Sequence, residues 1–299
     1  MRGKRKRSWD YYKNELAYIT MYLPALLFFC IFVIYPLIRA LYTSLTDWNG
    51  LSPTFNFIGL GNYRTLFADT YVLRTVSTTF KYTIAVTLGQ NLLALIMALA
   101  LNQKFRGRNV LRTMVFVPSI LSGLIVGYIW SFLYSDPLMK LGKLLDIPLL
   151  ANNVLSSQTF AIFAAAFVTI WRSAGWTMMI YLAGLQNVPA ELLEAASIDG
   201  ANAWHKLRYI TLPLLMPSFT VNIILTFERG LKDFDSVFAL TGGGPGDATM
   251  TMALNIYRES FYFSRAGYGT AIGVVLFCVI VVLTLIQLKF FRKGENSLE

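Results

Sequence analysis

The sequence predicts an all-α integral membrane protein with six transmembrane helices. Of its 299 residues, 56% are hydrophobic and only 14% are charged, which is more apolar material than a soluble core of this length needs. Lysine and arginine collect in short runs beside apolar stretches, as is typical of membrane orientation signals. Six stretches reach the roughly 20 residues that a helix needs to cross about 30 Å of hydrocarbon, at residues 18–42, 80–101, 111–134, 159–186, 212–240 and 269–291.

The chain is predicted to consist of a basic N-terminus, residues 1–17, and a six-span domain, residues 18–299. The first apolar stretch is too long for a cleaved signal and continues through Tyr35 and Pro36 to Arg39 without a small-residue cleavage site, so we expect it to remain as a membrane helix. With the N-terminus inside, fifteen lysines and arginines lie on the cytoplasmic side and seven on the outer side. This bias predicts that both termini are cytoplasmic.

The composition also argues against several classes of site. A net charge of +10 would suit nucleic acid, but the basic residues lie beside the predicted spans, so no nucleic-acid partner is expected. Cys30 and Cys278 each lie within an apolar run, and His205 is the only histidine. The sequence therefore indicates neither a disulfide framework nor a metal site.

The third span, and the loop that joins the first two spans, give less specific predictions. Residues 57–67 are expected to form a helix across the outer face of the membrane, although a plain connector fits as well without the resemblance described below. Pro118 and its small neighbours in the third span allow a kink and close packing. Trp130 and Tyr134 suit an aromatic belt at the outer end better than a solute pathway.

The fourth span carries a charge at membrane depth. Arg172 lies well inside this span and is flanked by Trp171 and Trp176. A charged side chain there costs roughly 2.5–3.5 kcal/mol, so it should face a partner or water rather than lipid. Aromatic faces beside hydrogen-bonding groups suit sugar rings, which have an apolar face and an equator of hydroxyls.

The fifth span contains further charges in an otherwise apolar segment. Glu228 and Lys232 are four residues apart and can pair on one helical face, and Asp235 falls on the same side. These charges either reach water near the outer end of the span or form a polar wall facing Arg172 across a cavity. We favour the wall, with Glu228, Lys232 and Asp233 as lining residues.

Residues 187–211 form a polar interruption between the fourth and fifth spans. Glu191 and Glu194 suit the first turns of a short helix, because the helix dipole favours acid there. Gly200 can adopt the left-handed conformation that ends a helix, and Asn202 can cap a second one. The pattern predicts a helix, a glycine elbow and a helix, which would either lie on the membrane surface or transmit force to another protein.

The spacing in this loop resembles that of one family. Permease subunits of ABC importers carry the pattern EAA-x3-G-x9-I-x-L-P, which is matched here by Glu194, Ala195, Ala196, Gly200, Ile210, Leu212 and Pro213. Tyr35-Pro36, the run FIGLGNY from Phe57 and the run LTGGGP from Leu240 resemble the carbohydrate-uptake branch of maltose and glycerol-phosphate type. The resemblance covers nearly all of the chain.

This resemblance implies a type I ABC importer permease fold in a bacterial or archaeal cell membrane. It implies a heterodimer with a second, homologous permease, two ATP-binding subunits and an extracytoplasmic solute-binding protein. ATP and Mg would bind the partner ATPases, so this chain is expected to be neither an enzyme nor a cofactor-binding protein. Residues 187–211 would be the coupling loop, and Pro213 would set the start of the fifth span.

The resemblance also implies roles for particular residues. The expected ATPase-coupling residues are Glu194, Ala195, Ala196, Asp199, Gly200 and Ala201. The expected lining residues of the substrate pathway are Trp171, Arg172, Gly175, Trp176, Glu228, Lys232, Asp233 and Asp235.

The expected substrate is a saccharide, with an oligosaccharide preferred. Arg172 and the charges of the fifth span are more ionic than a neutral sugar requires, which leaves an acidic saccharide or a sugar-phosphate-like solute open. A glycerol-phosphate permease is the alternative within the family. An ion-coupled secondary transporter is a more distant one, because no internal repeat is visible.

Overall fold

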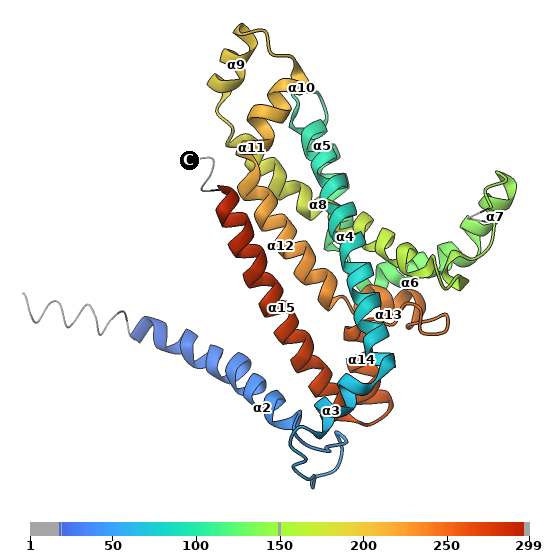
Figure 1. Cartoon of the computed structure of the whole chain (residues 1–299). Coiled ribbons are helices and arrows are strands. Elements are labelled where there is room, and N and C mark those ends of the chain that lie inside the picture. The colour runs from blue at the N-terminus through green and yellow to red at the C-terminus, as the bar shows by residue number, and fades with distance from the viewer. Residues whose placement is uncertain (1–17, 19, 149–150, 296–299) are drawn as a thin grey trace, which may run out of the picture. The chain divides into compact units, whose positions relative to one another are not determined.

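The computed structural model describes residues 18, 20–148 and 151–295, so the predicted cytoplasmic segment 1–17 lies outside the described residues. The described chain is built of helices, and the bridge between Thr46 and Phe57 is an isolated pairing within that part of the chain. The all-α prediction is therefore confirmed (Figure 1). The chain forms two compact units, residues 1–66 with 259–274 and residues 67–258 with 275–299.

The first unit contains the first predicted span and the outer loop. A helix runs over Thr20–Thr43 and includes a π-helical stretch, η1 (Cys30–Ile34), followed by α2 (Tyr35–Thr43). The expected helix over 57–67 begins only at Gly61, as α3 (Gly61–Ala68). Its Asn62 side chain donates to the carbonyls of Ser44 and Thr46, at 2.9 and 2.8 Å, and so fixes the turn that follows α2.

Polar contacts hold the remainder of this unit together. The side chain and backbone of Asn56 donate to the carboxylate of Asp47 and hold its pKa below the ordinary value. Within the π-helical segment η5 (Arg258–Tyr262), the buried carboxylate of Glu259 pairs with Arg265, which follows this segment, at 2.6 Å. A Cβ at Gly267 would lie 2.2 Å from the carbonyl oxygen of Thr46, so only glycine permits this close approach.

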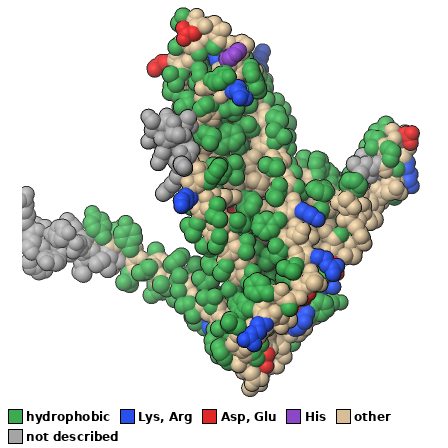
Figure 2. Space-filling view, in the orientation of Figure 1, with side chains coloured by type: hydrophobic (Ala, Val, Ile, Leu, Met, Phe, Trp, Pro, Cys, Tyr) green, Lys and Arg blue, Asp and Glu red, His purple; other side chains and the backbone are tan. Residues whose placement is uncertain are grey.

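The second unit packs around three long helices, α4 (Thr70–Asn102), α8 (Ala161–Gln186) and α12 (Met216–Lys232). Small residues such as Ala94 and Ala98 let these helices approach closely. A second buried cluster includes Tyr82, Val86 and Val168. Hydrophobic side chains, among them Leu88, Leu92 and Ile96, also cover much of the outer face along α4 (Figure 2). Helices that are apolar on their outward faces suit a lipid environment.

The third predicted span is broken rather than continuous. It consists of α5 (Arg108–Phe116), the 3-10 turn η2 (Val117–Ile120) and α6 (Gly123–Ser135), followed by α7 (Pro137–Leu144). The two halves meet at 96°. Pro118 lacks a backbone N–H, and Leu121 has the extended angles φ −71° and ψ 145°, so the helix cannot continue there.

The fifth predicted span is broken twice. Helix α11 (Leu212–Leu214) continues the segment before it, and a 65° bend separates Ala203–Leu214 from Met216–Lys232. Pro217, in the first turn of α12, therefore marks the start of the long helix, and the prediction for Pro213 is wrong. At the other end, the backbone of Asp233 is extended, which ends α12, and α13 (Asp235–Thr241) follows as a separate helix.

The remaining predicted spans correspond to helices. Three described helices are long and apolar enough to cross a membrane, namely Thr20–Thr43, Thr70–Asn102 and Ala266–Phe291, and each bent pair can add one more. The predicted fourth span is α8, whose apolar run is diluted by Arg172 and its polar neighbours. Short helices η3 (Val154–Ser156) and α14 (Met252–Tyr257) complete the second unit, and α15 (Ala266–Glu295) ends the described chain.

Candidate functional site

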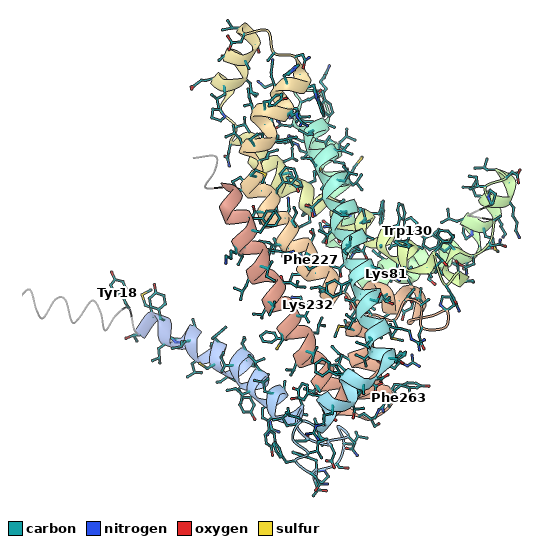
Figure 3. The ribbon with its side chains drawn as sticks, viewed as in Figure 1. Tyr18, Lys81, Trp130, Phe227, Lys232 and Phe263 are labelled. Carbon is teal, nitrogen blue, oxygen red and sulfur yellow. The ribbon has the colours of Figure 1, made fainter. Side chains whose placement is uncertain are left out.

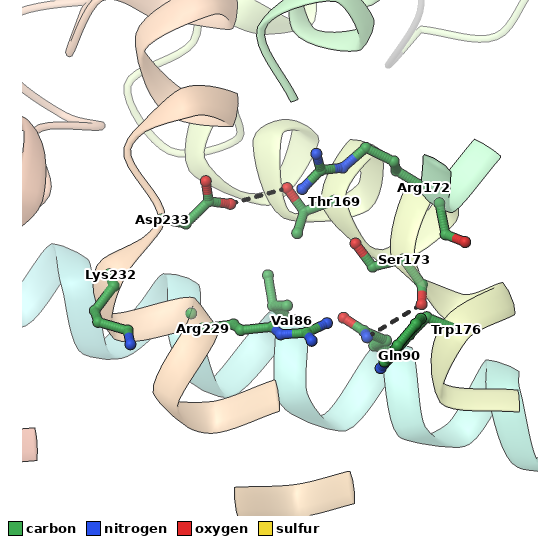
Figure 4. Close-up of a pocket in the computed structure, with 11 residues that line it drawn as sticks. Val86, Gln90, Thr169, Arg172, Ser173, Trp176, Arg229, Lys232 and Asp233 are labelled. Carbon is green, nitrogen blue, oxygen red and sulfur yellow. Dashed lines mark hydrogen bonds between the residues drawn. The ribbon is translucent and has the colours of Figure 1, made fainter. Parts of the chain in front are cut away.

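A cavity of about 440 Å³ lies inside the second unit, between α4, α8, α12 and η2 (Figure 4). This volume is in the range of small-molecule sites, roughly 300–1,000 Å³. Its wall combines charged, hydroxyl and aromatic groups: Val86, Gln90, Ser119, Thr169, Arg172, Ser173, Trp176, Arg229, Gly230, Lys232 and Asp233. Such a mixture inside an apolar bundle makes this cavity the candidate for a polar solute pathway.

Helix α8 supplies one wall through a single helical face. Thr169, Arg172, Ser173 and Trp176 recur at spacings of three and four residues, which brings their side chains to the same side. The Arg172 Nε is buried without a hydrogen-bond partner in the described chain. A Cβ at Gly123 would lie 2.7 Å from Arg172 Nη1, so this glycine makes room for the guanidinium.

Helix α12 supplies the opposite wall, at its last turn. Lys232 pairs with Glu228 at 2.5 Å, as the four-residue spacing predicts. Figure 3 shows Lys232 at the end of α12, five residues beyond Phe227. Arg229 lies over the ring of Trp176, 5.5 Å from its centroid, which is a cation–π contact across the cavity.

Asp233 occupies the break between α12 and α13 and is held by three donors. Its Oδ2 accepts hydrogen bonds from the hydroxyls of Tyr82, at 2.5 Å, and Thr169, at 3.2 Å. Its Oδ1 accepts from the backbone N–H of Ser236 at 3.3 Å, within the first turn of α13. The carboxylate therefore joins α4, α8 and the broken helix at one point.

We expect Tyr82→Phe to loosen this junction. The Tyr82 side chain is fully buried, and a hydrogen bond to a charged group is worth roughly 1.5–3 kcal/mol. The variant should lower the thermal stability of the purified complex and weaken solute uptake. Tyr128→Phe is the control, because Tyr128 is an exposed tyrosine of α6. Equal behaviour of the two variants would show that the Asp233 junction contributes nothing.

A hydrogen-bonded network continues from the cavity along α4, α8 and α12. Gln90 donates to the Thr177 hydroxyl at 2.6 Å. Asn91 accepts from Tyr181 at 2.7 Å and donates to Thr226 at 2.9 Å. Side-chain hydrogen bonds between membrane helices add specificity to their packing. They tie the three helices that form the cavity into one body.

The structure brings half of the predicted pathway residues to the cavity. Four predicted residues line the cavity, namely Arg172, Trp176, Lys232 and Asp233. The other four do not line it, namely Trp171, Gly175, Glu228 and Asp235. Trp171 packs edge-on against Trp130 at 5.5 Å, and Gly175 packs against the backbone of α5. Contact of any of them with a solute stays a prediction.

Sequence reasoning missed Arg229, Gln90 and Thr169 on the wall and Tyr82 behind it. A signal existed for Gln90, since an amide inside an apolar span needs a polar partner. Tyr82 and Thr169 gave none, because isolated hydroxyls in such spans are common packing residues. Within the described part of the chain, no group of three or more His, Cys, Asp or Glu side chains could hold a metal ion.

The predicted coupling loop forms the opposite end of this unit from α13 and α14 (Figure 1). Helix α9 (Ala190–Ile198) ends before Gly200, whose φ is +81°, and Asn202 caps α10 (Ala203–Lys206) by accepting from the His205 N–H at 2.9 Å. Lys206 donates to Ser197 across the elbow at 2.7 Å. The predicted helix, glycine elbow and helix are confirmed.

This loop presents charged and apolar groups outward. Glu194 and Gly200 are exposed, and Ile198 has 88% of its surface exposed. Leu192, on the same helix, is 46% exposed, so two large apolar side chains of α9 lie at the surface. The coupling role of the six predicted residues stays a prediction.

Comparisons with known proteins agree with this geometry. Residues 90–294 match the family described as binding-protein-dependent transport system inner membrane component. The chain is 35% identical over 265 residues to the multiple sugar-binding transport system permease protein MsmF of Streptococcus mutans, covering 89% of this chain and 91% of that protein. It is also 35% identical over 285 residues to the probable starch degradation products transport system permease protein AmyD of Thermoanaerobacterium thermosulfurigenes, covering 95% and 97%.

A solved structure shows the same fold. In the crystal structure of a bacterial alginate ABC transporter in complex with an alginate pentasaccharide-bound periplasmic protein, one chain matches with a TM-score of 0.81 and 22% identity. The match covers 97% of this chain and 98% of that one. The chain thus has the fold of an ABC importer permease.

Proposed function

Because the chain belongs to the family of binding-protein-dependent transport system inner membrane components, we propose a route through the protein and a class of solute for its transport. The protein is the permease subunit of an ATP-driven saccharide importer. It is a transport subunit and not an enzyme, since ATP hydrolysis resides on partner subunits. The observation that carries the solute pathway is the cavity between α4, α8 and α12, because it places charged and aromatic groups inside an apolar bundle.

The importer works with a solute-binding protein and ATPase subunits in the inner membrane, which this chain crosses several times. In finer detail, we propose a heterodimer with a second, homologous permease and a pair of ATP-binding subunits that hold ATP and Mg. The excess of lysine and arginine on one side supports cytoplasmic termini and a cytoplasmic coupling loop.

We propose an oligosaccharide as the solute. The cavity of about 440 Å³ offers hydroxyl and amide groups for sugar hydroxyls and the Trp176 ring for an apolar sugar face. The printed names of the two relatives, multiple sugar and starch degradation products, support this class of solute.

ATP-driven closure of the partner subunits would move α9 and α10. The helical segment Ala203–Leu214 connects the loop to the 65° bend before α12, so a tilt of that segment displaces α12. Helix α12 carries Arg229, Lys232 and Asp233 into the cavity wall, so the same displacement changes access to the cavity. The helix is then a two-state element that the ATPase biases from one end and the solute from the other.

The test is Glu194→Lys in the importer reconstituted in proteoliposomes with its partner subunits. If Glu194 makes a charge-assisted contact with a basic residue of the ATPase, reversing the charge should reduce ATP-driven saccharide uptake at least tenfold, because losing one partner of such a pair costs about 2–5 kcal/mol. Asp136→Lys, at a carboxylate outside the coupling loop whose side chain is 47% exposed, should leave uptake unchanged. Uptake that persisted without ATPase subunits and followed an ion gradient would replace this proposal with a secondary transporter.

A further inference from the structure

The charges on the cavity wall do not balance. Three cationic side chains line it, Arg172, Arg229 and Lys232, against the single carboxylate of Asp233. Lys232 is neutralised by Glu228. The carboxylate of Asp233 already accepts hydrogen bonds from Tyr82, Thr169 and Ser236. Within the described chain, neither guanidinium has a carboxylate in ion-pair distance, so the cavity wall carries a net positive charge.

Arg172 lines the cavity, and its guanidinium packs beside Gly123 of α6. Its Nε is buried and has no hydrogen-bond partner among the described residues, and its Nη1 fits against the space left open at Gly123. Asp235 approaches the same glycine, with its Cβ 3.0 Å from the position of a Gly123 Cβ, yet it forms no ion pair with Arg172. An unpaired guanidinium at membrane depth is costly, and an anionic group of a ligand would offset that cost.

Arg229 is oriented for the same ligand group from the other wall. The Trp176 ring supports its guanidinium without using its five N–H donors. Guanidinium forks match carboxylate and phosphate oxygens in a bidentate manner, whereas an ammonium acts as a point charge. In Figure 4, Arg229 extends from α12 toward Val86 and Gln90, while the end of the Arg172 side chain lies beside Thr169. Gln90 and Ser173 nearby suit neutral hydroxyls.

We infer that the transported saccharide carries an anionic substituent, which Arg172 and Arg229 bind from opposite walls of the cavity. This inference rests on the proposed function and narrows its substrate class. The shared ligand chemistry is an oxyanion on a sugar, either the carboxylate of a uronic acid or a phosphate ester. Asp233 then accepts hydrogen bonds that join the helices and does not bind the solute itself.

The test uses the complete importer in proteoliposomes, with its partner permease, ATPases and solute-binding protein. The probes are hexuronate disaccharides, the same disaccharides after reduction of each carboxyl to a primary alcohol, and hexose phosphates. An anionic probe should be taken up at least tenfold faster than its neutral counterpart, and the uronate and phosphate arms identify which oxyanion is carried. Arg172→Gln and Arg229→Gln should each reduce that uptake about tenfold, because each loses charge-assisted hydrogen bonds.

Matched variants separate charge from folding. Arg172→Lys and Arg229→Lys keep the charge and should retain more uptake than the glutamine variants, although the fork is lost. Arg74→Gln removes an exposed arginine of α4 outside the cavity and should behave as wild type. If the glutamine variants fail to insert into the membrane, the wild-type importer still tests the inference. It should take up each acidic disaccharide faster than its neutral, reduced counterpart.

The two possible failures are distinguishable. ATP-dependent uptake of the neutral disaccharide at an equal or higher rate than its acidic counterpart would overturn the anionic inference and leave the saccharide importer intact. The absence of ATP-dependent uptake for every saccharide would overturn the proposed function and the inference with it.

Discussion

Replacing Gly175 with alanine should destabilise the permease and disable transport. Gly175 is buried in α8, where an added Cβ would lie 2.2 Å from the backbone oxygen of Val115 and 2.8 Å from the Cα of Phe116. Backbone cannot rotate away as a side chain can, so α5 and α8 would have to separate. Overpacking costs roughly 1–3 kcal/mol, and we expect the upper part of that range.

The same separation would change the cavity, because η2 directly follows α5 and places Ser119 on the wall that faces Arg172. The measurements are thermal unfolding of the purified complex and ATP-driven uptake. Both should fall well below wild type.

Gly89→Ala is the matched control for this prediction. Gly89 lies on α4, where the atom nearest an added Cβ is Cδ1 of Ile170, at 2.5 Å. That methyl is the far end of a flexible side chain and can take another rotamer, so Gly89→Ala should cost much less. If the two alanine variants were equally harmful, tight backbone contact between α5 and α8 would not explain the role of Gly175.

Local features of the fold could be predicted from the sequence because local forces determine them. Apolar length sets the positions of the membrane helices, and the pairing of Glu228 with Lys232 depends only on their spacing. The glycine elbow was predictable for the same reason, since only a left-handed residue ends α9 in this way. Arg172 was correctly singled out as a residue that must face something other than lipid.

The break at Asp233 and most of the cavity wall could not be predicted, because they depend on distant partners. The helix end at Asp233 is stabilised by Tyr82, which is 151 residues away in the sequence. Gly175 lies on the same face of α8 as Trp171, but the backbone of α5 occupies the space beside Gly175. Arg229 belongs to the cavity because Trp176 lies opposite, and no spacing within one helix reveals that.

Replacing Gly200 with valine should uncouple ATP hydrolysis from uptake. Gly200 has a φ of +81°, and no atom lies within 4 Å of an added Cβ, so the cost is conformational and not steric crowding. The left-handed conformation costs a non-glycine residue about 1–2 kcal/mol, and a β-branched residue resists it most. The elbow would open, and α9 would no longer be held at its angle to α10. In the reconstituted importer, ATP-driven uptake should fall more than tenfold while the chain still inserts into the membrane.

Gly107→Val provides the control with the same backbone strain. Gly107 has a φ of +88° and likewise meets no atom within 4 Å of an added Cβ, but it precedes α5 instead of joining α9 to α10. If the angle of the elbow transmits the motion, Gly107→Val should retain most of the uptake that Gly200→Val loses. Equal loss in both variants would attribute the effect to backbone strain in general, and the elbow would then have no particular part in linking the ATPase contact to α12.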